Sequence, residues 1–457
     1  MRGFLIAGVR SGVGKTTIAM GLMKCFENVS PFKVGPDYID GKFHEYVTSN
    51  KSYNLDYILM GEKGIKRTFL KNSKEISIVE GVMGLYDGRG VELDNGSSAH
   101  IGRILDLPVI LVVDGRKIST SIAAEVLGYR DLDRRVKLKG VIINKISSKK
   151  TYDILKESIE KYCDIKCIGY MLNIENIGIE ERHLGLMQAQ EIKDLDIKVE
   201  KISKQMKETI DLDYIYNISK IKEMKDNFFL QEIMEKKKNE YTGMKIAIAK
   251  DEAFSFYYND NIEFLEELGI EIIYFSPVHD KKIPKDINML YFGGGYPENY
   301  SKELSENKSM INSIRDFFNK NGVIYGECGG FIYLSDTLET LDGKKYDFVG
   351  ISGSNIKMKN RLNIKRFGYI DIEYNGKFKG RGHEFHYSEI INSDENIRKE
   401  FKIRKPDGRN WTCGFHVKNV LCGYPHIHFF KSQDIIFDLL NKAKESKWKN
   451  ILKFLKV

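Results

Sequence analysis

Short apolar runs alternate with amphipathic stretches through residues 1–193. A continuous run of four to eight apolar residues is typical of a buried strand, whereas apolar positions every three or four residues predict a helix. Strands that alternate with helices form βαβ units, which build a parallel sheet with helices on both faces. The predicted strands are "GFLIAGV", "PFKVG", "ISIVEGV", "PVILVVDG" and "KGVIINKI", and the region ends near "RHLGLMQAQEI".

The pattern changes at residue 194. Residues 194–243 are rich in lysine and have helical periodicity, which predicts helices that close the first domain, followed by a charged linker near "MEKKKNEY". A second α/β domain is predicted for residues 244–440, and a basic amphipathic helix for residues 441–457. The strands of this second domain are predicted in "GMKIAIAKD", "IEIIYF", "NMLYFGGGYPE", "GVIYGECGG", "KYDFVGIS", "GYIDIEY" and "GRGHEFHYS".

The composition is that of an ordinary globular protein with more than one domain. The chain has 457 residues, of which 42% are hydrophobic and 30% charged. Six cysteines are too few for a disulfide framework, and the chain shows neither a membrane-spanning run nor a secretory signal, so we expect a cytoplasmic protein. The net charge of +8 is scattered and accompanies no nucleic-acid-binding motif. We therefore expect neither nucleic acid nor membrane as a partner.

A phosphate-binding loop is predicted between the first strand and the first helix, in "GVRSGVGKTT". Glycines let backbone N–H groups turn toward phosphate oxygens, and the helix N-terminus favours negative charge. Lys15 would reach the β- and γ-phosphates of ATP, and Thr16 would bind Mg²⁺. The first glycine, Gly8, lies one residue earlier than in the strict motif. The predicted ATP-binding residues are Gly12, Val13, Gly14, Lys15, Thr16 and Thr17.

Two acidic loops follow strands of the same predicted sheet, "KVGPDYIDGKFH" and "VEGVMGLYDG". Loops at the carboxyl ends of parallel strands are typical ligand sites, although Asp beside Pro or Gly is equally typical of a turn. Lys33 would neutralise a phosphoryl group or a substrate carboxylate, and Asn144, after another strand, is either a base-reading amide or a turn former. The acidic residues are Asp37, Asp40, Glu80 and Asp87, and the predicted metal ligands are Thr16, Asp37 and Glu80.

A nucleophile is predicted in "VIYGECGGFIYLSD", where Cys328 lies between a strand and a helix and is flanked by glycines. Small residues tolerate the strained turn of a nucleophile elbow, and the N–H that follows the nucleophile can donate to an oxyanion. A cysteine nucleophile needs a base. The candidate bases are His426 and His428 in "GYPHIHFF", with His383 and His386 as rivals, and the candidate oxyanion donors are Gly294, Gly295 and Gly329.

Eight blocks of the chain, in order and spread over nearly its whole length, resemble the cobyrinate a,c-diamide synthases, which are glutamine-dependent ligases of corrinoid biosynthesis. The resemblance implies an α/β fold with an N-terminal P-loop parallel-sheet domain, similar to dethiobiotin synthetase, joined to a C-terminal α/β class I glutamine amidotransferase domain. The blocks are "RSGVGKTT", "FKVGPDYID", "NLDYIL", "VEGVMGLYDG", "ERHLGL", "GGYPE", "ECGGFIYL" and "HEFHYS".

The resemblance also implies roles for individual residues. Cys328 would be the glutaminase nucleophile and His426 its base, and the three glycines named above would bind glutamine. His428 stands where triad amidotransferases more often carry a glutamate, so it would orient His426, and the two histidines could exchange roles. Glu80 and Asp87 match the acidic loop of the ATP–Mg²⁺ site. The corrinoid-binding and phosphoryl-transfer residues would be Lys33, Asp37, Tyr38, Ile39, Asp40 and Asp87, with Gly41 in place of the family's usual proline.

The implied reaction is ATP-dependent amidation of the a and c side chains of cobyrinate. Phosphoryl transfer makes an acyl phosphate, and ammonia from glutamine attacks it after travelling from the second domain to the first. The small-molecule partners would be ATP, L-glutamine and the tetrapyrrole, and a homodimer is a possible assembly. Nickel-sirohydrochlorin and hydrogenobyrinate are alternative acceptors, and cobyric acid synthase is a less similar relative. A different class of function is a partitioning-type nucleotide-switch ATPase with an inert amidotransferase domain.

Overall fold

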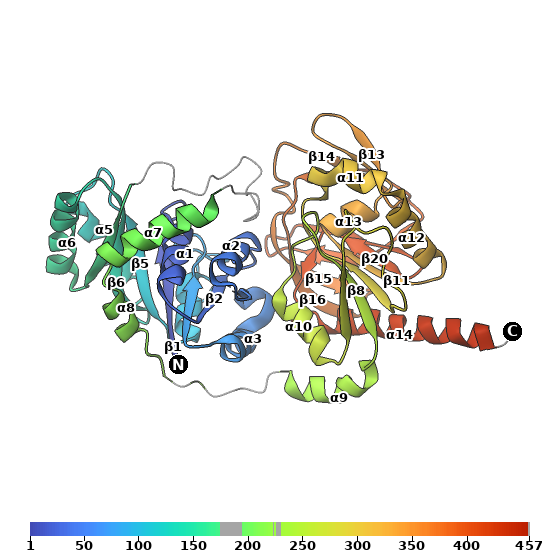
Figure 1. Cartoon of the computed structure of the whole chain (residues 1–457), viewed down its shortest axis with the longest axis horizontal. Coiled ribbons are helices and arrows are strands. Elements are labelled where there is room, and N and C mark those ends of the chain that lie inside the picture. Colours follow the sequence, from blue (N-terminus) through green and yellow to red (C-terminus); the bar gives the residue numbers. More distant parts are fainter. Residues whose placement is uncertain (174–193, 223, 225–229, 456–457) are drawn as a thin grey trace. The chain divides into compact units, whose positions relative to one another are not determined.

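The computed structural model describes residues 1–173, 194–222, 224 and 230–455, with side chains described as far as residue 446. The chain forms two compact units, Met1–Phe229 and Leu230–Val457, which Figure 1 traces along the sequence. The segment "RHLGLMQAQEI" and the block "ERHLGL" lie outside the described residues. No helix among the described residues combines the length and the apolar character needed to cross a membrane.

The first unit is built on a seven-stranded sheet in which every pair of neighbouring strands is parallel. The order is β3-β2-β4-β1-β5-β6-β7. All five predicted strands are present, whereas the pattern does not predict β3, which has three residues, or β7, which a glycine interrupts. The strands are β1 Arg2–Gly8, β2 Val29–Val34, β3 Tyr53–Leu55, β4 Ile76–Glu80, β5 Pro108–Asp114, β6 Lys137–Ile146 and β7 Cys167–Leu172.

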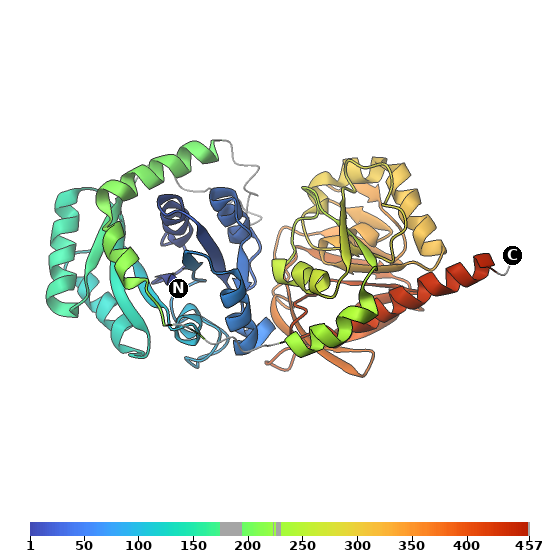
Figure 2. The same ribbon diagram turned by 60° about the horizontal axis from the view of Figure 1, so that its bottom comes forward.

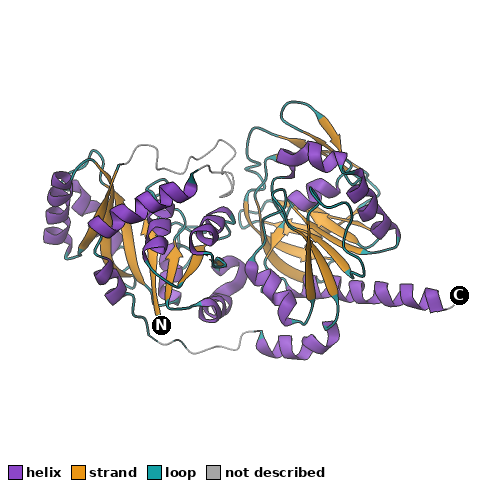
Figure 3. Cartoon of the chain, in the orientation of Figure 1, coloured by secondary structure: helices purple, strands orange, loops and turns teal. Residues whose placement is uncertain are grey.

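Helices flank this sheet, as the secondary-structure colours of Figure 3 show. β5 is buried along its whole length, which explains its continuous apolar sequence. α7 packs on α1, where Gly21 leaves room for Ile202 and Met206. The helices are α1 Lys15–Cys25, α2 Ile39–Thr48, α3 Tyr57–Asn72, α4 Ser98–Ile104, α5 Ser121–Asp131, α6 Lys149–Cys163, α7 Leu195–Thr209 and α8 Leu212–Ile218.

The second unit is built on a ten-stranded mixed sheet with the order β21-β16-β15-β18-β19-β20-β11-β10-β8-β9. The five strands from β20 to β9 are parallel, and the others pair antiparallel. The strands of this sheet are β8 Lys245–Ala249, β9 Glu271–Phe275, β10 Met289–Phe292, β11 Val323–Glu327, β15 Gly368–Tyr374, β16 Phe378–Glu384, β18 Arg398–Arg404, β19 Asn410–Val417, β20 Val420–Gly423 and β21 His426–Ile427.

A smaller four-stranded sheet and several helices complete the second unit. The small sheet has the order β13-β12-β14-β17. Its strands are β12 Thr337–Glu339, β13 Lys345–Asp347, β14 Ser354–Met358 and β17 Ser388–Ser393. The helices are α9 Gln231–Tyr241, α10 Asn259–Glu267, the 3₁₀ helix η2 Pro297–Tyr300, α11 Ser301–Glu306, α12 Lys308–Asn319, α13 Gly329–Leu334 and α14 Gln433–Leu455.

The structure corrects the prediction of a charged linker near "MEKKKNEY", because this stretch belongs to helix α9. Met234 and Tyr241 are seven residues apart and both buried, so a mostly polar segment still has an apolar side. The Tyr241 hydroxyl donates to Asn441 Oδ1 at 2.9 Å, which attaches α9 to α14. Figure 2 shows α14 as one long helix. It begins at Gln433, earlier than the predicted helix at 441–457.

Candidate functional site

The phosphate loop of the first unit joins β1 to α1. Gly14, immediately before α1, has φ 96° and ψ 28°, a left-handed conformation that favours glycine. Asn144, at the end of β6, donates its side-chain N–H to Val13 O at 2.9 Å and accepts from Lys145 N–H at 2.8 Å. Its amide therefore stabilises the phosphate loop and its own turn. Of the two alternatives predicted for Asn144, a base-reading amide or a turn former, these contacts match the turn former. Thr16 and Thr17 follow in the first turn of α1.

A network of buried polar side chains lies beneath this loop and centres on Glu80, the last residue of β4. The Thr16 hydroxyl donates to Glu80 Oε1 at 2.6 Å, and His44 Nε2 donates to Glu80 Oε2 at 2.6 Å. Glu80 is fully buried. Burial alone would raise its pKa, but Lys33 and His44 lower the pKa of this carboxyl. Glu80 is therefore an ionised acceptor bonded to the threonine of the phosphate loop.

Lys33 holds the other side of this network. Its Nζ lies 2.7 Å from Asp40 Oδ2 and 3.3 Å from Glu80 Oε1, and it donates to Gly81 O at 2.9 Å. Burial favours the neutral amine, yet the carboxylates of Asp40 and Glu80 raise the pKa of Lys33. Burial and the charge of Glu80 raise the pKa of Asp40 to about 7. The structure thus brings together Thr16, Lys33, Asp40 and Glu80.

Two of the predicted acidic residues make local turns. Asp37 Oδ1 accepts from Ile39 N–H at 2.7 Å, and Asp87 Oδ2 accepts from Gly84 N–H at 2.8 Å. Tyr38 and Ile39 form the start of α2. The block "NLDYIL" is also explained by such contacts. Asn54 donates to Gly35 O and Asp37 O, both at 2.8 Å, and Asp56 caps α3.

The donor set fits a magnesium ion that is held together with a triphosphate. Mg²⁺ usually takes one or two protein oxygens and completes its shell with water and phosphate oxygens. The Thr16 hydroxyl and the Glu80 carboxylate, 2.6 Å apart, provide two such oxygens. Within the described residues, no group of three or more His, Cys, Asp and Glu side chains could hold a metal ion by itself. The protein atoms therefore suit a metal ion that arrives with the nucleotide.

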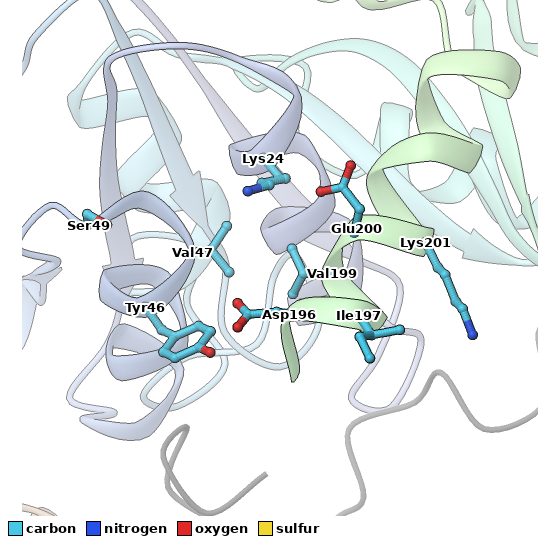
Figure 4. A pocket seen from close by; sticks show the side chains of 9 residues that line it. All are labelled: Lys24, Tyr46, Val47, Ser49, Asp196, Ile197, Val199, Glu200 and Lys201. Carbon is cyan, nitrogen blue, oxygen red and sulfur yellow. The ribbon is translucent and has the colours of Figure 1, made fainter. Parts of the chain in front are cut away.

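A pocket of about 610 Å³ lies elsewhere on the first unit (Figure 4). Its lining comes from the end of α1, the end of α2 and the start of α7. Lys24, in this lining, is nine residues and about 14 Å further along α1 than Lys15. None of the predicted site residues lines it. The lining residues are Lys24, Tyr46, Val47, Ser49, Asp196, Ile197, Val199, Glu200 and Lys201.

The predicted nucleophile of the second unit lies in a strained turn between β11 and α13. Cys328 has φ 47° and ψ −102°, which is uncommon for a residue other than glycine. Its N–H donates to Gly423 O at 2.8 Å, and its thiol lies 3.8 Å from Phe385 O. Burial and the nearby Glu298 carboxyl raise the pKa of the Cys328 thiol. The resting group is therefore a thiol rather than a thiolate.

The glycine turn after β10 brings the nucleophile and one histidine to the same place. Gly330 N–H donates to Gly293 O at 2.9 Å, and a Cβ placed on Gly329 would lie 2.9 Å from Gly295 N. A Cβ placed on Gly294 would lie 2.4 Å from His426 Cε1. The turn at 293–295 therefore contacts both the Cys328 elbow and the His426 imidazole.

The four candidate histidines have different surroundings. His386 is held at both ring nitrogens, 2.8 Å from Ser388 O and 3.4 Å from Glu384 Oε2, so it is poorly suited to act as a base. His383 lies 2.8 Å from the Tyr258 hydroxyl and stacks on His426 with ring centroids 4.9 Å apart. Burial, with the nearby His383 and His386, lowers the pKa of His426 well below 6.5.

His428 is neutral, because burial lowers its pKa to about 3. Its Nδ1 accepts from Phe430 N–H at 3.3 Å, and in the described part of the chain its buried Nε2 has no hydrogen-bond partner. The predicted orienting role of His428 toward His426 stays a prediction.

Sequence reasoning missed several residues of both sites. In the first unit His44 lies one helical turn after Asp40 on α2, and that spacing is a signal that could have identified it. In the second unit the blocks "GGYPE" and "ECGG" contain Glu298 and Glu327, whose pKa burial raises to about 7 in each case. Their burial could not be read from the local sequence.

The fold and the two sites define a chain that joins a nucleotide-binding unit to a glutamine amidotransferase unit. Residues 4–186 match the family described as the CobQ/CobB/MinD/ParA nucleotide binding domain. Residues 245–434 match the CobB/CobQ-like glutamine amidotransferase domain. These matches confirm the predicted fold class.

Relatives similar to the whole chain carry one name, cobyrinate a,c-diamide synthase. The protein from Fusobacterium nucleatum subsp. nucleatum is 53% identical over 95% of this chain and 99% of its own. Those from Caldanaerobacter subterraneus subsp. tengcongensis and Clostridium tetani are 40% and 42% identical, each over 97% of this chain and 98% and 100% of their own. The chain belongs to the cobyrinate a,c-diamide synthase family.

Proposed function

We propose that this protein amidates the a and c side-chain carboxylates of cobyrinate, with ATP as phosphoryl donor and glutamine or ammonia as nitrogen donor. Carboxylates resist attack by ammonia because oxide is a poor leaving group. Transfer of the γ-phosphoryl group of ATP gives an acyl phosphate, from which ammonia displaces phosphate to form the amide. The product is cobyrinate a,c-diamide, and we expect the reaction to take place in the cytoplasm.

In the first unit, the phosphate loop would bind the triphosphate through its backbone N–H groups, and Lys15 would neutralise the transferring phosphoryl group. Thr16 and Glu80 would hold Mg²⁺, which when bound neutralises phosphate charge. Lys33 would offset the charge of the substrate carboxylate, and Asp37, Tyr38, Ile39, Asp40 and Asp87 would lie around the acceptor. The contacts among Thr16, Lys33, Asp40 and Glu80 support the assignments of these four residues.

In the second unit, Cys328 would attack the carboxamide carbon of glutamine after giving its proton to His426. N–H groups of Gly294, Gly295 and Gly329 would stabilise the oxyanion. His426 would then protonate the leaving ammonia, and water would hydrolyse the thioester to glutamate. A neutral imidazole is the form that can accept a proton, and the lowered pKa of His426 keeps it in that form.

One observation carries the proposal. A single chain combines a phosphate loop whose threonine is bonded to a buried carboxylate with a thiol elbow that shares a glycine turn with a neutral histidine. Neither site alone gives a reason for the presence of the other in the same chain, whereas amide synthesis from glutamine needs both. The length over which the named relatives match supports the same conclusion.

The test is a direct assay of the purified protein with MgATP and with either glutamine or ammonium. Cobyrinate, hydrogenobyrinate and nickel-sirohydrochlorin are supplied separately, and products are measured by mass spectrometry. We expect two successive mass changes of one amidation each with cobyrinate, and release of ADP. A preference for another tetrapyrrole would correct the acceptor but keep the chemistry. Absence of amide product and of ADP with every acceptor and both nitrogen donors would contradict the proposal.

A further inference from the structure

A buried carboxylate directly precedes the proposed nucleophile. Glu327 is the last residue of β11, and its side chain is 2% exposed. It accepts hydrogen bonds from the Tyr325 hydroxyl at 2.7 Å, the Tyr291 hydroxyl at 3.0 Å and the backbone N–H of Ile427 at 3.1 Å. None of these three partners is a cation. The third partner is informative, because Ile427 lies between His426 and His428.

Stability alone does not account for a carboxylate in this place. Burial of Glu327 disfavours its charged form, which is why its pKa is raised to about 7. Replacing a whole buried ion pair by apolar side chains of similar volume is often neutral or stabilising, so a buried charge is weak evidence of a role in stability. The three hydrogen bonds therefore point to what the carboxylate holds in position rather than to the stability of the fold.

The strand that carries His426 is held by side chains as well as by its pairing with a neighbouring strand. β21 has two residues and lies at the end of the ten-stranded sheet, where it pairs with β16. Glu327 accepts the N–H of Ile427. Asn261, at the start of α10, donates to Ile427 O and accepts from Phe429 N–H, both at 2.8 Å. Peptide groups on both sides of Ile427 are thus fixed by side chains.

Building on the proposed glutamine chemistry, we propose that Glu327 is a positioning residue for the base His426. The carboxylate is attached to the backbone next to Cys328, and its acceptor oxygen fixes the peptide that joins His426 to Ile427. One 3.1 Å hydrogen bond therefore links the backbone of the nucleophile to that of the base. A base must lie within hydrogen-bond reach of its proton, and a displacement of about 1 Å can lower a rate about 100-fold.

Four variants of the full-length protein test this role. Glu327→Met removes the acceptor with little change in volume, and Glu327→Asp keeps the charge but withdraws it by one methylene. Glu327→Gln keeps a carbonyl oxygen that can accept from Ile427 N–H. Tyr291→Phe, the matched control, removes a hydroxyl from the other carboxylate oxygen and leaves the bond to Ile427 in place.

The measurements are kcat and KM for glutamine hydrolysis, amidation with ammonium, the thermal midpoint, and the rate at which 6-diazo-5-oxo-L-norleucine alkylates Cys328. We expect Glu327→Met to lower kcat and the alkylation rate about 100-fold, with KM within about 3-fold and unchanged use of ammonium. Glu327→Asp should lose about 10-fold, whereas Glu327→Gln and Tyr291→Phe should stay within about 3-fold of the parent.

The measurements distinguish failure of the proposed glutamine chemistry from failure of the positioning role of Glu327. A parent protein that releases no ammonia from glutamine overturns the proposed function itself. An active parent with Glu327→Met equal to Tyr291→Phe overturns only the positioning role, as does a Glu327→Met variant that loses both nitrogen sources equally. If Glu327→Met does not fold, Glu327→Asp decides: a kcat well below that of Glu327→Gln supports the role, and an equal kcat overturns it.

Discussion

The two units use the same local architecture in different electrostatic surroundings. In each, a parallel strand in the interior of the sheet leads through a glycine-containing turn into a helix, from β1 to α1 and from β11 to α13. Charged side chains surround the first turn, where Lys33, Asp40 and Glu80 form a buried ionic network. Around the second turn the ionisable groups are pushed toward their neutral forms, as with Cys328 and His426.

This difference shows that the strand–turn–helix element does not by itself select a chemistry. At the first turn the left-handed residue is Gly14, a conformation that would let backbone N–H groups face an anion, and opposite charges lie close by. At the second turn the strained residue is the cysteine itself, so the conformation presents a side chain rather than the backbone. The proposed functions can therefore be separated experimentally, one turn at a time.

The largest effect should come from Cys328→Ala. Removal of the nucleophile is expected to lower glutamine-dependent amidation about 10⁴-fold or more, while amidation with ammonium stays within about 2-fold. Product formation from each nitrogen source, measured side by side, checks this. Loss of both activities in a folded variant would show that the two units do not act as separate sites.

Lys15→Ala is the reciprocal change. Lys15 is expected to act on the phosphates, so its removal should lower amidation from both nitrogen sources about 100- to 1000-fold. Basal glutamine hydrolysis, measured as glutamate formed without ATP, should be unchanged. A variant that keeps ammonium-dependent amidation would contradict the assignment of the phosphate loop.

The pH dependence of glutamine hydrolysis should sharpen the comparison of the two turns, although the expected change is smaller. Because the pKa of His426 lies well below 6.5, its imidazole stays a proton acceptor at pH 6. We expect kcat/KM for glutamine to change less than about 2-fold between pH 8 and pH 6, whereas an unperturbed histidine would lose about three-quarters of its neutral form. An acid limb centred near pH 6.5 would instead indicate an exposed base.

Among these three substitutions, Asn144→Ala should have the smallest effect. The variant loses the brace to Val13 O, so the phosphate loop should bind nucleotide more weakly and KM for ATP should rise about 5-fold. Glutamine hydrolysis serves as the internal control and should not change. An altered preference between ATP and other nucleoside triphosphates would mean that Asn144 reads the base after all.

Features encoded by neighbouring residues could be predicted from the sequence. The parallel sheet follows from continuous apolar runs, and the phosphate loop and the cysteine elbow follow from glycines at fixed spacing. The linker prediction was wrong because the apolar side of α9 consists of few residues, among them Met234 and Tyr241, in a very polar segment.

Contacts between distant residues could not be predicted. His44 reaches Glu80 across 36 positions, and Glu327 reaches Ile427 across 100. Such pairs depend on which strands become neighbours, which local patterns do not determine. Asp37 and Asp87 show the opposite case. A carboxylate in a glycine-rich loop often accepts a hydrogen bond from a backbone N–H a few residues away, as both of these do.

The close approach of Gly294 to His426 has a practical consequence. One added carbon atom at this position would overlap the imidazole at 2.4 Å, although the backbone there is not in the left-handed region. The methyl group of an alanine would therefore displace the imidazole of His426, while the Cys328 thiol would remain in the protein. A cell that relied on this variant would need free ammonium, rather than glutamine, to make the corrin side-chain amides.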